Sequence, residues 1–166
     1  MARRVISLNL SEQSINSAIK ELRTYKEWVS KKTDELCERL AAIGATKVSI
    51  GYARAIYSGD KDIAVTVEKT SNGYSIVANG ESVFFVEFGT GATYGYGHPE
   101  AKEHGMGPGT YPDGKGHWDD PSGWWIPRDH GGGHTYGNPP NPVMYETGKE
   151  LGQMVLEIAK EVFAVG

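Results

Sequence analysis

The sequence has few of the features that identify common classes of protein. A single cysteine, Cys37, excludes an intrachain disulfide and any zinc site that needs several cysteines. No stretch approaches the roughly 18 apolar residues of a membrane-spanning helix, and the N-terminus lacks the apolar run of a signal peptide. Basic residues are outnumbered, with 17 Lys and Arg against 21 Asp and Glu, which argues against a surface that grips a nucleic-acid backbone. We therefore expect a soluble protein, intracellular where it is made, that binds neither membranes nor specific nucleic-acid sequences.

The segment from residue 92 to residue 141 lacks large aliphatic side chains. It has no Leu, Val or Phe and a single Ile, yet it contains all five histidines, three of the four tryptophans and 12 of the 22 glycines. Because such a segment cannot form an ordinary hydrophobic core, it depends on neighbouring elements for its order. We predict one domain over residues 1–166, with a core of residues 5–91 and 141–165 and an inserted loop at residues 92–140.

The most regular apolar pattern lies near the N-terminus. Its members follow the alternating four-three spacing of an amphipathic helix: Ile15, Ile19, Leu22, Val29, Leu36, Leu40 and Ile43. Ser11 is a good N-cap, and Gly44 is the expected C-terminal stop. Unbroken, this helix is roughly 50 Å long, against a radius of gyration of about 15 Å for a compact domain of this size. It therefore either breaks at residues 30–33 or projects, in which case another subunit would cover its apolar seam.

The apolar period changes to two after this helix. Residues 63–67 alternate as a half-buried strand, and Asn72-Gly73 predicts a tight hairpin turn to a return strand at residues 74–78. Two further short strands are expected at residues 5–10 and from Val48 to Ile50. The sheet is therefore predicted to be small and mainly antiparallel.

A hairpin and a second helix are expected after the sheet. Residues 124–127 and 134–136 flank a Gly-rich turn, which favours a small hairpin carried on the loop. Asn141 is predicted to cap a helix with Pro142 at its first position. The seam of this helix comprises Met144, Gly148, Leu151, Val155, Ile158, Val162 and Val165. Gly148 and Gly152 predict a close approach by another helix. The fold class is thus α+β, with a long N-terminal helix and a C-terminal helix packed on the sheet.

The loop histidines raise the question of a metal site. The candidate ligands are His98, His104, His117, His130 and His134, together with Asp119 or Asp120. Their spacings match no ligand pattern, since His-Glu-x-x-His is absent and one cysteine cannot complete the zinc-deaminase motif. We favour surface or aromatic-stacking histidines and predict no catalytic residue, metal or cofactor. A metal-dependent hydrolase that uses these histidines is the alternative.

Glu87 is the one carboxylate within the apolar run that ends at Phe88. That run is compatible with a turn or two of helix, because Phe84, Phe85 and Phe88 share a helical face, or with a strand. Glu87 could serve as a general acid or base. A Glu that precedes Gly-Thr-Gly more often binds backbone N–H groups and fixes the turn, and we favour that structural role.

The aromatic residues of the loop predict a binding surface. The residues assigned to it are Trp118, Trp124, Trp125 and Tyr136. Tyr and Trp are enriched in protein interfaces, and the same side chains stack on sugars, so a carbohydrate-binding module is a further alternative. Stacking on nucleic-acid bases is the weaker interpretation, since no basic residues alternate with the aromatic ones.

Taken in order along the chain, these features resemble the small neck proteins of tailed bacteriophages, also described as tail components or minor head–tail proteins. Both have an amphipathic helix, a short sheet, an aromatic run ending in Glu-Phe-Gly-Thr-Gly, a Gly-rich loop and a Pro-rich start of the C-terminal helix. The residues that carry the resemblance are Glu87, Phe88, Gly89, Thr90, Gly91, Asn141 and Pro142. Val143-Met144 departs from the family, in which an aromatic residue usually follows Pro142.

The resemblance implies a non-enzymatic structural component of a phage or prophage virion, present in the host cytoplasm during assembly, that joins head and tail. Such proteins form rings by repeating one subunit, and a ring needs heterologous contacts. The implied partners are further copies of the chain and the neighbouring head-completion and tail-completion proteins. The two helical seams and the aromatic loop are the surfaces that we assign to these contacts.

Overall fold

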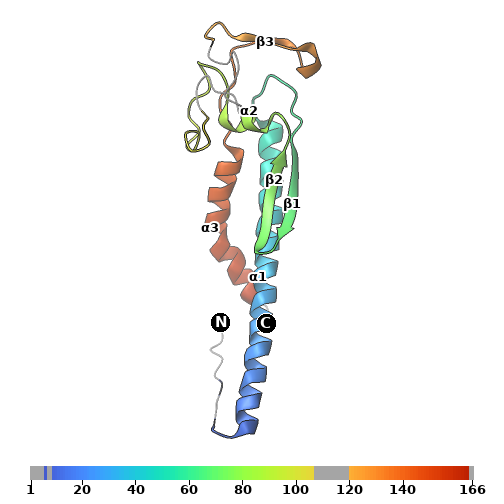
Figure 1. Ribbon diagram of the computed structural model, residues 1–166, viewed down its shortest axis with the longest axis vertical. Helices are drawn as coiled ribbons and strands as arrows, with labels where there is room; N and C mark the ends of the chain where they lie inside the picture. The colour runs from blue at the N-terminus through green and yellow to red at the C-terminus, as the bar shows by residue number, and fades with distance from the viewer. Residues whose placement is uncertain (1–5, 7–8, 107–119, 165–166) are drawn as a thin grey trace.

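The computed structural model describes residue 6, residues 9–106 and residues 120–164. One long helix, α1 (Glu12–Arg54), runs most of the length of the molecule (Figure 1). Its 43 residues span about 65 Å at 1.5 Å per residue. The predicted N-cap is confirmed, because the Ser11 hydroxyl accepts a hydrogen bond from the Ser14 N–H at 3.3 Å. The helix does not break at residues 30–33, so the projecting alternative is the one found.

The prediction that the helix stops at Gly44 is wrong. Gly44 is buried inside α1, where a Cβ atom would overlap Ile76 and come within 2.7 Å of Leu151. Glycine stands here because the sheet and the C-terminal helix both pack closely against α1, and it therefore acts as a packing residue. The strand expected from Val48 to Ile50 is also wrong, because α1 continues through these residues and Val48 is fully buried on its inner face.

The predicted hairpin is confirmed. Strand β1 (Ala64–Thr70) pairs antiparallel with β2 (Gly73–Asn79), with Val67 opposite Ile76. The turn lies one residue earlier than expected, because Thr70 pairs with Gly73 and leaves Ser71 and Asn72 between the strands. The strand expected at residues 5–10 lies mainly outside the described residues, and Ile6, Asn9 and Leu10 belong to no strand.

The run before the Gly-Thr-Gly turn is a short helix, α2 (Val83–Phe88), and the strand alternative does not occur. A second antiparallel hairpin on the loop is confirmed, formed by β3 (Trp124–Ile126) and β4 (Gly133–Thr135) around a 3-10 turn, η1 (Arg128–His130). Figure 1 places this hairpin at the end of the molecule where α1 finishes.

The C-terminal helix, α3 (Val143–Ala164), runs back along α1 (Figure 1). An ion pair between Lys47 and Glu150 and an edge contact between Trp28 and Phe163 link the two helices. Helix against helix is thus confirmed, but the close approach uses glycines of α1. At Gly148 and Gly152 of α3, an added Cβ atom would meet nothing within 4 Å.

The hydrophobic core lies where α1 ends, beside the first hairpin, α2 and the start of α3. Its buried members are Val48, Tyr52, Ala55 and Val86. The arrangement has the α+β architecture expected from the sequence, with α1 packed on both α3 and the small antiparallel sheet. Among the described residues, the helices contain no apolar stretch long enough to cross a bilayer.

Candidate functional site

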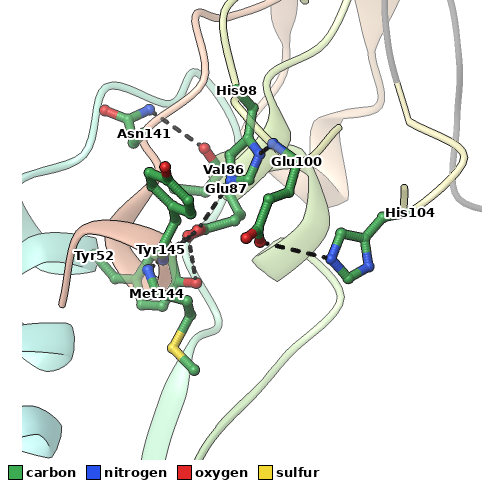
Figure 2. Close-up of polar contacts among 9 residues, drawn as sticks. All are labelled: Tyr52, Val86, Glu87, His98, Glu100, His104, Asn141, Met144 and Tyr145. Atoms are coloured by element: carbon green, nitrogen blue, oxygen red, sulfur yellow. Dashed lines mark hydrogen bonds and ion pairs between the residues drawn. The ribbon is translucent and has the colours of Figure 1, made fainter. Parts of the chain in front are cut away.

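Glu87, at the end of α2, is the centre of a buried polar cluster (Figure 2). Its side chain accepts hydrogen bonds from the Tyr52 hydroxyl at 2.8 Å and from His98 Nε2 at 3.3 Å. The backbone N–H groups of Met144 and Tyr145 donate to the same carboxylate at 3.1 Å and 3.3 Å. Glu87 is only 5% exposed, so a single carboxylate joins α1, α2, α3 and the loop away from solvent.

The cluster explains how α3 begins. Met144 and Tyr145 lie in the first turn of α3, where backbone N–H groups have no partner within the helix. A carboxylate at this end also interacts favourably with the helix dipole. Glu87 therefore caps α3, although it precedes the helix by more than fifty residues in the sequence. The N–H groups that it binds are those of α3, whereas the sequence had pointed to the Gly-Thr-Gly turn.

The prediction that Asn141 caps this helix is wrong. Its side-chain oxygen accepts the Ile56 N–H at 3.3 Å, and its amide nitrogen donates to the carbonyl oxygens of Ile56 and Val86. Asn141 therefore bonds the segment that follows α1 to α2, as the Val86 bond in Figure 2 illustrates. Pro142 lies one residue before the helix, and its carbonyl oxygen accepts the Glu146 N–H at 2.9 Å.

The groups around Glu87 are held in fixed protonation and hydrogen-bonding roles. Burial, followed by the negative charge of Glu87, raises the pKa of Tyr52, so its hydroxyl stays protonated and donates. The Glu100 N–H donates to Nδ1 of His98, which places the proton of a neutral imidazole on Nε2, facing Glu87. Four hydrogen-bond donors surround the Glu87 carboxylate. This arrangement favours a structural role for Glu87 over the role of a general base.

The two ends of the loop are joined beside this cluster. Thr90 and Asn138 form an antiparallel bridge, and the Thr90 hydroxyl donates to the Asn138 side-chain oxygen at 2.6 Å. Gly89 and Gly91 have positive φ angles of 75° and 85°. A Cβ atom on Gly137 would overlap the Thr90 carbonyl oxygen, so only glycine permits the strands to approach. The Phe-Gly-Thr-Gly motif thus closes the base of the loop.

Two of the loop histidines pack on Phe88. The ring centroids of His98 and His104 lie 4.3 Å and 5.3 Å from the buried ring of Phe88. His104 also lies 4.0 Å from Glu100 (Figure 2). Within residues 9–106 and 120–164, no group of three or more His, Cys, Asp or Glu side chains converges as metal ligands do. His117 and Asp119 lie outside the described residues.

The loop hairpin brings some of the predicted interface residues together. The His134 ring lies between Trp125 and Tyr136, at centroid distances of 5.1 Å and 4.9 Å. Trp125 is 75% exposed and Tyr136 is also exposed, so they form an aromatic surface on the hairpin. Trp124 is half-buried, and Trp118 lies outside the described residues.

A cavity of about 940 Å³ separates this hairpin from the segments around α2. Its lining includes Trp124, Trp125, Phe85 and the carboxylates Asp60 and Asp62. The Asp62 carboxylate accepts hydrogen bonds from the Ser82 hydroxyl and from two backbone N–H groups, and these bonds lower its pKa. Asp62 therefore has a structural task, which is to fix the chain as it enters α2.

Sequence reasoning missed three members of these clusters. Tyr52 was hard to assign, although it follows Val48 by four residues on one helical face. The sequence offers His98 as a metal ligand or an aromatic-stacking residue, with no indication that it bonds Glu87, and it assigns no role to Asn138. A pattern that could have found Tyr52 is its helical spacing with Ala41, Gly44 and Val48, on a face of α1 different from that of Ile43. For His98 and Asn138 we find no sequence signal, because Asn138 meets Thr90 48 residues away and His98 meets Glu87 only across the Gly-Thr-Gly turn.

Comparisons of the chain with protein-family models, with curated proteins and with solved structures return no match.

Proposed function

We propose that the protein is a structural component of the neck of a phage or prophage virion, where copies assemble into a ring that joins head and tail. The proposal starts from the order of motifs in the sequence. It also fits the buried cluster, in which hydrogen bonds of Glu87, Thr90 and Asn138 hold helices and loop together. On this proposal the protein acts through assembly and has no reaction of its own.

The observation that carries the proposal is the amount of surface that the subunit leaves exposed. The accessible surface of the whole chain, with the residues outside the described ranges included, is 11309 Å², whereas a compact monomer of 18.1 kDa exposes about 8,100 Å². The excess is roughly 3,200 Å². A specific protein interface buries about 800 Å² on each partner, and a ring subunit has two such faces. The excess is therefore large enough for ring contacts on both sides.

Large apolar side chains contribute to this surface. Ile15, Ile19 and Leu22 lie on the projecting half of α1, and Leu22 is 56% exposed. At the opposite end, Trp125 and Tyr136 stand on the hairpin. Exposed apolar clusters at both ends of an elongated subunit suit a component that contacts copies of itself and further neck proteins.

A genetic experiment tests this function. In the phage or prophage that encodes the chain, a nonsense mutation in its gene should yield DNA-filled heads and finished tails that do not join. Electron microscopy of the lysate would reveal the two separate structures. Normal virions in normal yield would refute the proposal.

A carbohydrate-binding module is the second candidate, because the exposed Trp125 and the carboxylate of Asp60 both line the cavity. Aromatic rings with adjacent carboxylates suit the stacking and hydrogen bonding of a sugar. Quenching of tryptophan fluorescence by glycans, lost in Trp125→Ala, would favour this candidate over the neck protein.

A further inference from the structure

The outer face of α3 has the shape of a shallow groove. Gly148, Gly152, Val155, Leu156 and Ala159 lie within about a third of the helix circumference, beside the face that packs on α1. Leu156 is 66% exposed, and no atom lies within 4 Å of where a Cβ atom would stand on either glycine. Each glycine weakens an exposed helix by about 1 kcal/mol relative to Ala, a cost that close packing of another helix would offset.

The projecting half of α1 has the complementary shape. Ile15, Ile19 and Leu22 follow one another at spacings of four and three residues, and all three are exposed. Gly148, Gly152 and Val155 have the same spacing, so both sets cover about 10 Å of helix. Large side chains at one set of positions, and the absence of side chains at the two glycines of the other, allow two helices to pack with interdigitation.

We propose that the α1 arm of one copy, defined as Ile15, Ile19 and Leu22, packs against the α3 groove of the next copy. This inference rests on the proposed ring assembly and names the contact that builds the ring. A subunit cannot make the contact with itself, since its arm extends well beyond the C-terminal end of its own α3 (Figure 1).

In the alternative contact, the α1 arms of two copies pack against each other, and this arrangement fits the two surfaces less well. In a parallel pair of arms, Lys26 would occupy a seam position beside the same residue of its partner, where like charges repel. Any symmetric arm pair would also close a dimer and leave both α3 grooves uncovered. The arm-to-groove contact covers both surfaces, repeats from copy to copy, and accounts for part of the excess area.

Cross-linking between single-cysteine variants tests this contact. In a Cys37→Ser background, Ile19→Cys and Gly152→Cys are made separately, and a short bismaleimide reagent tolerates a shift of about one helical turn. A covalent dimer is expected when the two variants are mixed, and much less of it when each is treated alone. Mass photometry of the same samples reports assembly independently of the reagent.

The possible outcomes distinguish a failure of the arm-to-groove contact from a failure of the proposed ring assembly. Oligomers that form without a cross-link in the mixture would overturn the contact and leave ring assembly standing, as would Ile19→Cys that links efficiently to itself. A chain that stays monomeric at every concentration would overturn both.

Filling the groove gives a second test that does not depend on cysteine chemistry. Gly152→Leu should weaken self-association roughly tenfold or more, equivalent to 1.4 kcal/mol, while the melting temperature of the monomer stays the same or rises. The matched control is Gln153→Leu, an exposed position of α3 outside the groove. Equal association of the two variants would contradict the proposed contact.

Discussion

The two ends of α1 lie in very different surroundings. Near its C-terminal end, Val48 and Tyr52 are buried in the core, and the Tyr52 hydroxyl is bonded to Glu87. Near its N-terminal end, Ile19 and Leu22 have the same apolar character but are 41% and 56% exposed. One half of the helix thus completes a core within its own chain. The other half carries a similar apolar seam, in which Ala18 is buried but the larger Ile19 and Leu22 point outward. A sequence pattern alone therefore does not reveal what covers an apolar face.

The largest effect is expected at the buried end, from Glu87→Ala. Tyr52, His98 and the first turn of α3 would lose their shared acceptor. Each buried donor left without a partner costs about 1–3 kcal/mol, so the unfolding free energy should fall by more than about 3 kcal/mol. Urea denaturation measures it. Glu100→Ala, on a far more exposed carboxylate, is the control and should change little. Similar losses from both variants would contradict the assigned cap.

Truncating one apolar residue at each end of α1 tests the comparison directly. Val48→Ala should cost about 2 kcal/mol of unfolding free energy, because it leaves a cavity in the core. Leu22→Ala should stay within about 0.5 kcal/mol in the monomer yet reduce self-association. Urea denaturation below the assembly concentration gives the first quantity, and mass photometry the second. If Leu22→Ala destabilises the monomer as much as Val48→Ala, the arm is not an open surface.

Adding one methyl group at two glycines should have opposite effects. Gly44→Ala forces a Cβ atom into the Ile76 and Leu151 side chains and should destabilise by about 1–2 kcal/mol. Gly148→Ala meets open space and should stabilise the monomer by up to about 1 kcal/mol through helix propensity. Thermal unfolding of both variants checks the signs. A loss at Gly148 would mean that its outer face is already occupied.

The smallest effect concerns acid stability. Hydrogen bonds from Ser82 and Glu81 lower the pKa of Asp62 below its usual 3.8. A lowered folded-state pKa means that the stabilisation is present above pH 3.8 and is lost as the pH falls through the folded value. Asp62→Asn should therefore flatten the decline in urea midpoint below about pH 4 without removing it. An unchanged acid profile would show that Asp62 is not coupled to folding.

Much of the fold could be predicted because its signals are local. Ser11 caps α1 with its own side chain, and the residues of β1 and β2 alternate around a short turn. The second hairpin and the presence of α3 follow equally from turn residues and apolar spacing. Each of these elements is specified by residues close together in the sequence.

The failures come from partners distant in the sequence. Glycine often ends a helix, but Gly44 lies inside α1, where Ile76 and Leu151 pack so closely that a larger residue would not fit. Asn141 is a residue type that often caps helices, but here the Glu87 carboxylate accepts the backbone N–H group of Met144 in the first turn of α3. The candidate site was therefore predicted as a set of motif residues, whereas their roles depend on contacts that no local pattern encodes.

Sedimentation velocity of the purified protein across a wide concentration range tests directly whether copies of the chain cover the exposed N-terminal half of α1. The proposal predicts a monomer at the lowest concentrations and a discrete ring at the highest, with the ring lost in an Ile19→Ser, Leu22→Ser double variant. A wild-type protein that remains monomeric throughout, or a double variant that assembles as well as the wild type, would contradict it.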